Sequence, residues 1–183
     1  MASGALNPNR LDTFPKLLLE NARVRGNRPA NREKDLGIWL TWSWEQVAEE
    51  VRALACGLKQ LGVEPEDKVS ICGDNRPHLY WAITAVQAIG ATPVPLYQDS
   101  VADEMQYIYE HAEAKFAIVE DQEQVDKLLE IKGKLPKLKH IIYMGDVKQK
   151  PCLCPAKPGR SDEWVPGRSE KIAGRSKISA GRS

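Results

Sequence analysis

The segment Gly73-Asp74-Asn75 lies where a ligand loop is expected, because it follows an apolar run ending at Cys72 and precedes an apolar helical pattern. At such a place, converging backbone N–H groups at a helix N-terminus can hold a phosphate, which requires a glycine-rich loop. This segment has one glycine and one acidic residue, and neither Gly-x-x-x-x-Gly-Lys-Ser/Thr nor Gly-x-Gly-x-x-Gly occurs in the 183 residues. The segment therefore predicts a turn and a helix cap, with a phosphate loop as the alternative.

The cysteines and histidines give little support for a metal site. Cys152 and Cys154 are one residue apart, but structural zinc takes four ligands, usually in two pairs, and the sequence has no second Cys/His pair. His78, His111 and His140 are scattered singly, and no Gly-x-Ser-x-Gly sequence indicates a serine nucleophile. We therefore assign no catalytic, cofactor-binding or metal-ligating residue from the sequence.

The charged residues divide the chain into an acidic part and a basic part. Residues 1–147 contain 17 Lys/Arg and 22 Asp/Glu, a net charge of −5, whereas residues 148–183 contain 9 and 3, a net charge of +6. In the basic part, Gly, Pro and Ser supply 13 of 36 residues, and no apolar periodicity is present. These patterns predict a globular region over residues 1–147 and a low-complexity tail over residues 148–183 that is disordered or out of frame.

Short apolar runs alternate with helical patterns along the globular region. A hairpin is expected over 30–34 and 38–42, with Gly37 at the bend, and a helix is expected from Trp44 to Leu61 with a Ser43–Gln46 capping box. Strands are expected over 68–72, 92–96, 116–119 and 140–143, with helices over 75–89, from Ser100 onward and over 122–131. Repeated β-α-β spacing predicts an α/β fold with a mainly parallel sheet and helices on both faces.

Residues 77–98 contain no Asp, Glu, Lys or Arg, yet they do not predict a membrane-spanning helix. Gly90, Pro93 and Pro95 interrupt the segment, so we expect a buried helix followed by a buried strand, although the two prolines favour an edge position or a frayed end for 92–96. Cys56 and Cys72 lie within apolar patterns and are expected to be buried free thiols. Together with the lack of a secretory signal after Met1, this usage of cysteine indicates a cytoplasmic protein.

Several motifs, in this order and spacing, resemble those of the acyl- and aminoacyl-adenylate-forming enzymes. The segment 40–47, Leu-Thr-Trp-Ser-Trp-Glu-Gln-Val, resembles the first core motif of that superfamily. The run Glu66-Asp67-Lys68-Val69 resembles a Gly-Asp-x-Val sequence, with Glu66 where glycine is usual. Asn75-Arg76-Pro77 together with Val94-Pro95-Leu96-Tyr97 is similar to long-chain fatty acyl-CoA synthetases, and the resemblance extends from about Leu11 to Tyr143.

This resemblance implies a reaction in two steps for the complete enzyme. A fatty acid carboxylate attacks the α-phosphate of Mg²⁺-bound ATP to give an acyl-adenylate, and coenzyme A then displaces AMP. The family's phosphate loop, which is rich in Ser, Thr and Gly and ends in Pro-Lys-Gly, does not occur in these 183 residues, nor does its C-terminal lid. We therefore expect an N-terminal piece of a long-chain acyl-CoA synthetase, truncated or wrongly translated, that binds ATP, Mg²⁺ and coenzyme A poorly and is inactive alone.

Two other hypotheses remain open from the sequence. The chain is a non-enzymatic interaction protein, or a complementing subunit of a split synthetase, that pairs with a separately encoded remainder or with itself. Alternatively, the basic tail binds nucleic acid or an anionic membrane, although Trp164 is its only aromatic residue, which makes a dedicated nucleic-acid module a poor fit. No transmembrane segment is expected, and a peripheral membrane location is left open for the full-length parent.

Overall fold

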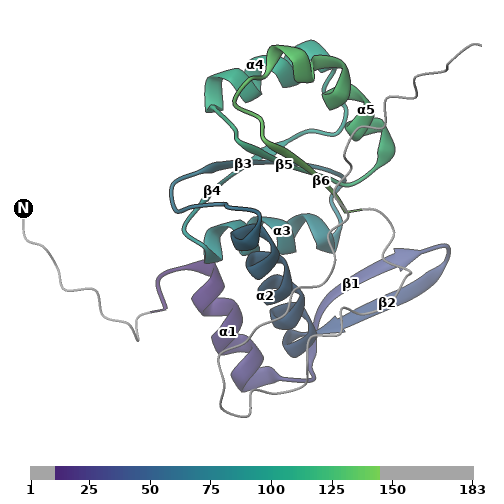
Figure 1. Cartoon of the computed structure of the whole chain (residues 1–183). Coiled ribbons are helices and arrows are strands. Elements are labelled where there is room, and N and C mark those ends of the chain that lie inside the picture. Colours follow the sequence, from purple (N-terminus) through teal and green to yellow (C-terminus); the bar gives the residue numbers. More distant parts are fainter. Residues whose placement is uncertain (1–10, 145–183) are drawn as a thin grey trace, which may run out of the picture.

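The computed structural model describes residues 11–144, which form a three-layer α/β arrangement beside a β-hairpin (Figure 1). The central sheet has four parallel strands in the order β4-β3-β5-β6. Its strands are β3 (Lys68–Cys72), β4 (Thr92–Leu96), β5 (Phe116–Val119) and β6 (His140–Tyr143). The helices are α1 (Phe14–Arg25), α2 (Trp44–Gln60), α3 (Pro77–Ala88), α4 (Ala102–Ala112), α5 (Gln122–Ile131) and the short 3-10 helix η1 (Lys132–Lys134). The separate antiparallel hairpin consists of β1 (Pro29–Asp35) and β2 (Ile38–Ser43).

Helices cover both faces of the sheet, as the sequence predicts. Alternate residues of β3 point to opposite faces, so Val69 and Ile71 pack into the core formed with α2 and α3. Cys72 packs into the second core, formed with α4 and α5 on the other face. Figure 1 shows α1, α2 and α3 on one side of the sheet and α4 and α5 on the other. Among the described residues β4 is an outer strand of the sheet, which agrees with the edge position that its two prolines favour, but the expectation of a buried strand is wrong because only Leu96 of β4 is buried.

The helix α2 follows directly from its sequence. The Ser43 side chain accepts a hydrogen bond from the Gln46 backbone N–H (3.2 Å), and the Gln46 side chain accepts one from the Ser43 backbone N–H (2.8 Å). This capping box was predicted, and it satisfies two donors that would otherwise lack partners at the start of the helix. The buried residues along the helix recur at three- and four-residue steps: Val47, Ala48, Val51, Ala55 and Leu58.

Three predicted helix ends are wrong. The helix α3 begins at Pro77 rather than Asn75, and its N-cap, Arg76, makes no side-chain cap bond. Proline fixes φ near the helical value and needs no N–H partner, so it occupies the first helical position. Ser100 does not cap α4, whose N-cap is Val101, and Gly133 lies inside η1 instead of ending α5.

The two cysteines of the described region differ in burial. Cys72 is fully buried, as predicted, but Cys56 is only half-buried, so the prediction for Cys56 is wrong. Within residues 11–144, no helix combines the length and the apolar character needed to cross a membrane.

Glu66 adopts a left-handed backbone conformation with φ of +69°, at the position where the resemblance implies glycine. Its N–H donates to the Gly90 carbonyl (2.9 Å), which holds the turn in place. This conformation costs a residue with a Cβ about 1–2 kcal/mol, and a glycine avoids that cost. Because glycine also makes the unfolded chain more flexible, which offsets part of the gain, Glu66→Gly should raise the free energy of unfolding by up to about 1 kcal/mol. Urea denaturation measures the change.

The control for this prediction is Glu64→Gly in the same turn. Glu64 does not have a positive φ, so the glycine adds only freedom to the unfolded chain and should destabilise the protein by roughly 0.5–1 kcal/mol. Equal losses of stability in the two variants would contradict the assignment of strain to Glu66.

Candidate site at the carboxyl edge of the sheet

The carboxyl ends of β3 and β5 mark the place where the fold can form a ligand crevice. The chain runs from β3 through α3 to β4 on one side, and β5 then lies on the other side of β3. The loops that follow the neighbouring strands β3 and β5 therefore lead in opposite directions along the edge of the sheet. In open α/β sheets, ligands bind at such a switch point outside the carboxyl ends of the strands.

Glu120, which directly follows β5, fills this place in the structure. Its backbone N–H donates to the Cys72 carbonyl (3.1 Å), and one of its carboxylate oxygens accepts from the Asp74 backbone N–H (2.5 Å). The Asp74 side chain turns onto its own loop and accepts from the Asn75 backbone N–H (2.6 Å). The loop therefore binds a carboxylate from its own chain with the N–H group that a ligand would use.

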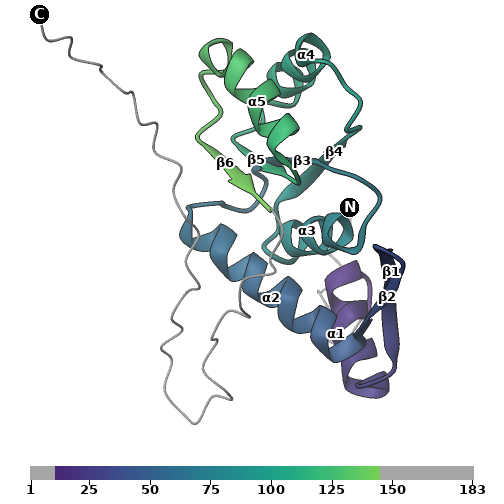
Figure 2. The same cartoon turned by 90° about the vertical axis from the view of Figure 1, so that its right-hand side faces the viewer.

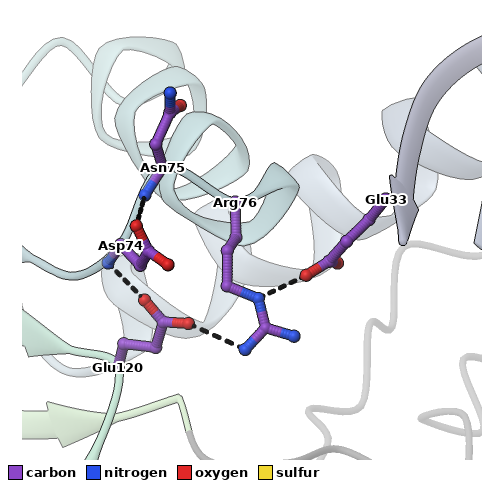
Figure 3. A network of polar contacts seen from close by, with 5 residues as sticks. All are labelled: Glu33, Asp74, Asn75, Arg76 and Glu120. Atoms are coloured by element: carbon purple, nitrogen blue, oxygen red, sulfur yellow. Dashed lines mark hydrogen bonds and ion pairs between the residues drawn. The ribbon is translucent and has the colours of Figure 1, made fainter. Parts of the chain in front are cut away.

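Arg76 connects this loop to the hairpin (Figure 3). Its Nη1 pairs with Glu120 (3.1 Å), and its Nε donates to the carboxylate of Glu33 on β1. The hydrogen bond to Glu33, supported by the charges of Glu33 and Glu120, raises the pKa of the Arg76 guanidinium despite partial burial. A single cation is thus held between carboxylates from two separate parts of the fold.

Aromatic side chains hold the hairpin against α3 beside this network. The Trp42 ring meets the Trp81 ring edge-on at a centroid distance of 5.4 Å, and His78 lies 4.6 Å from Trp81. The indole N–H of Trp81 donates to the Asn31 side chain (3.3 Å). The hairpin lies against α2 and α3, and Figure 2 views the molecule from the side on which the hairpin lies.

The chemistry available at this edge is that of a structural ion-pair network. The side chains of Glu33, Asp74 and Glu120 would repel the phosphates of a nucleotide, and the guanidinium of Arg76 is already shared by two carboxylates. In the part of the chain that the structure covers, no three His, Cys, Asp or Glu side chains are grouped so that they could hold a metal ion. The residues described therefore do not fit ATP or Mg²⁺ at this edge.

The prediction of a turn at Gly73-Asp74-Asn75 agrees with the structure, but the helix cap does not form. Residues 75 and 76 make a bend, and the helix begins after them without a side-chain cap. Nothing in the sequence pattern indicated Glu33 or Glu120 as partners of this loop. The one available signal was an acidic residue at the end of a buried strand, where the carboxyl edge of a parallel sheet gathers side chains.

The remaining candidate residues are dispersed. His78 packs on Trp81, His111 stacks on Tyr107 and His140 stacks on Phe116, on three different elements. Burial raises the pKa of the Cys72 thiol to about 11, so it stays protonated and unreactive at neutral pH. Cys152 and Cys154 lie outside the described residues.

Gly73 leaves the space that Glu120 occupies. A Cβ at this position would lie 2.6 Å from the Glu120 Oε2 and 2.9 Å from its Cβ, and the second contact cannot be relieved by rotating the end of the side chain. Gly73→Ala should therefore displace Glu120 and lower the free energy of unfolding by about 1 kcal/mol, measured by urea denaturation.

Gly57→Ala is the matched control for Gly73→Ala. Gly57 is inside α2, and a Cβ there meets no atom within 4 Å. Alanine is the better helix former, so this variant should gain roughly 0.5–1 kcal/mol. A loss of similar size in both variants would contradict the specific contact with Glu120.

Comparison with protein families matches residues 18–175 to the family described as AMP-binding enzyme. Long-chain-fatty-acid--CoA ligase ACSBG2 of Xenopus laevis is 33% identical over 141 residues, which are 75% of this chain and 19% of that protein. Long-chain-fatty-acid--CoA ligase FadD15 of Mycobacterium tuberculosis is 32% identical over 110 residues, 59% of this chain and 18% of that ligase. The chain therefore spans about a fifth of the length of these curated ligases.

A shorter relative also matches. Uncharacterized protein Rv1549 of Mycobacterium tuberculosis is 31% identical over 121 residues, which are 66% of this chain and 62% of that protein. The family match ends at residue 175, inside the tail that the sequence analysis separates from the globular region, so the boundary at residue 147 stays a prediction.

Solved structures show the same fold. The anthranilate CoA ligase AuaEII in complex with anthranoyl-AMP superposes with a TM-score of 0.65 at 26% identity, over 70% of this chain and 24% of that one. A putative long-chain-fatty-acid CoA ligase from Rhodopseudomonas palustris gives 0.63 at 25% identity, over 73% and 33%. The helices and parallel sheet described above are therefore those of the N-terminal part of adenylate-forming enzymes.

Proposed function

Since the chain belongs to the AMP-binding enzyme family, we propose that it supplies the N-terminal framework of a long-chain fatty acid–CoA ligase. The proposed reaction of the complete enzyme consumes a fatty acid, ATP and coenzyme A and gives a fatty acyl-CoA, AMP and pyrophosphate. The observation that carries the proposal is the match to curated long-chain ligases from a frog and a bacterium at about one-third identity.

We assign no step of this reaction to residues 11–144. The sheet edge where a nucleotide would bind in a fold of this kind is filled by Glu120 and surrounded by carboxylates. These 183 residues also lack the phosphate loop that the family resemblance implies. The proposed role of these residues is to position neighbouring polypeptide, and the nucleotide, Mg²⁺ and coenzyme A sites are proposed to lie in the rest of the ligase.

The alternative function is a non-enzymatic interaction protein that complements a separate ligase polypeptide. The outer edge of β6 favours this alternative, because β6 is the last strand of the sheet and pairs only with β5 among the described residues. An unpaired parallel edge is a template for a further strand. Co-expression with a ligase that lacks the matching N-terminal segment tests it, and separate elution of the two chains would contradict it.

The proposed framework role is tested by a chimera. Residues 11–144 replace the aligned segment of FadD15 of Mycobacterium tuberculosis, and oleate-dependent release of AMP is measured with coenzyme A present. We expect the chimera to retain ligation and the isolated 183-residue protein to show none. A folded, soluble chimera without activity would contradict the framework role, and ligation by the isolated protein would contradict the proposed division of the sites.

A further inference from the structure

The two faces of the hairpin have different surroundings. Cross-strand register places Asn31, Glu33 and Asp35 on one face, together with their partners on β2. This inner face is turned toward α3, where Asn31 bonds to Trp81 and Glu33 pairs with Arg76. Both acidic residues of the hairpin therefore lie on the inner face.

The outer face consists of Arg32, Lys34, Trp39 and Thr41, which alternate with the inner residues and pair across the strands as Arg32 with Thr41 and Lys34 with Trp39. All four are exposed, and 64% of the Trp39 surface is open to solvent. The outer face carries two cations, no acidic residue and an indole directly opposite an ammonium group.

The hairpin tip carries apolar side chains that the fold does not bury. Leu36 and Gly37 form a two-residue loop with φ of +46° and +85°, a conformation that favours Asn-Gly. A leucine is disfavoured in this backbone region, and at 87% exposure it packs against almost nothing. Ile38 is 67% exposed, but it pairs with Asp35 and therefore lies on the inner face, so Leu36 at the tip and Trp39 on the outer face are the apolar side chains that this side of the hairpin presents. In Figure 1 the closed end of the hairpin projects away from the helices.

We propose that the tip and outer face of this hairpin dock onto an anionic lipid surface. Leu36 and Trp39 enter the boundary between headgroups and acyl chains, where the polar N–H of an indole stays in contact with water while its rings are buried. Arg32 and Lys34 lie alongside and attract the anionic headgroups within a Debye length. This proposal stands on the hairpin alone and does not depend on the proposed ligase function.

Vesicles of phosphatidylglycerol and phosphatidylcholine provide the first test, with co-sedimentation of the full 183-residue protein as the measurement. Binding should be clear at low salt, weaken as salt rises and be nearly absent with phosphatidylcholine alone.

Leu36→Asn should reduce partitioning into the vesicles by about tenfold, because it removes one inserted apolar side chain. The same variant should raise the melting temperature, because asparagine suits the turn. A loss of binding in a more stable protein cannot come from unfolding.

Leu129→Gln is the matched control, because Leu129 is an exposed leucine (52%) on α5, across the sheet from α3. This variant should bind vesicles like the unmodified protein. Equal binding by all three proteins, or no binding by any of them, would overturn the proposal.

A second test locates the contact by quenching tryptophan fluorescence with vesicles that contain brominated acyl chains. The chain has five tryptophans, and the proposal places Trp39 in the bilayer boundary. Quenching should disappear in Trp39→Phe and persist in Trp164→Phe. The opposite pattern would place the contact in residues 148–183 and refute the hairpin site, as would a dimer in solution that depends on Leu36 without any binding to vesicles.

Discussion

Replacing Trp81 with alanine is expected to lower the free energy of unfolding by about 3–5 kcal/mol. Trp81 is 6% exposed and belongs to the core between α2, α3 and the sheet. It also contacts Trp42 edge-on and donates to Asn31, so it joins both strands of the hairpin to α3. The substitution removes core volume and hairpin contacts together, and the protection of hairpin amides against hydrogen exchange should fall more than that of β3.

Trp39→Ala is the control for this prediction, since Trp39 lies on the same hairpin but faces solvent. Its removal should change the free energy of unfolding by no more than about 0.5 kcal/mol. Urea denaturation followed by circular dichroism measures the global effect. If Trp81→Ala lowers protection evenly over the sheet and the hairpin, then Trp81 does not specifically attach the hairpin.

The parallel sheet could be predicted from the sequence because its strands are short runs rich in apolar residues that alternate with helical patterns. The run 116–119 is entirely apolar, the run 68–72 has three apolar residues, and helical patterns separate the strands, which leaves few arrangements other than a covered parallel sheet. The ends of helices were harder to predict. Asp74, Asn75 and Ser100 are all good capping residues, but Pro77 and Val101 set where the helices begin.

The polar network could not be predicted because it depends on how separate units meet. Arg76 pairs with Glu33, 43 positions earlier, and with Glu120, 44 positions later. The pair with Glu33 requires the orientation of the hairpin relative to α3, to which the contact between Trp42 and Trp81 contributes, and the pair with Glu120 requires β5 to lie beside β3 in the sheet. The sequence showed only that a loop follows β3, and the side chain that fills the loop comes from a different strand.

Asp67→Asn is expected to lower the free energy of unfolding at neutral pH by about 2–3 kcal/mol. Asp67, which directly precedes β3, is 7% exposed, and its carboxylate accepts from the Glu64 backbone N–H (3.0 Å) and pairs with Lys115 Nζ (2.6 Å). Burial by itself would raise its pKa, but the hydrogen bonds from Lys115 and Glu64 outweigh burial and hold the pKa below the usual value. The asparagine amide keeps the shape of the side chain but lacks the negative charge that accepts hydrogen bonds from Lys115 and from the Glu64 N–H.

The pH dependence gives the more specific result. Because the folded protein holds the pKa of Asp67 below its unfolded value of about 3.9, its stabilising effect is complete above that pH and disappears as the pH falls toward the folded pKa. The difference in the free energy of unfolding between Asp67→Asn and the unmodified protein should therefore shrink on acidification from pH about 6 to pH about 3.

The control variant Glu113→Gln separates the effect of burial from that of ion pairing alone. Glu113 also lies 2.6 Å from a lysine, Lys137, but both side chains are exposed. Solvent screens that pair, so its removal should leave the denaturation midpoint nearly unchanged at every pH. If the two variants behave alike, the short distance rather than the burial of Asp67 would determine what an ion pair contributes in this fold.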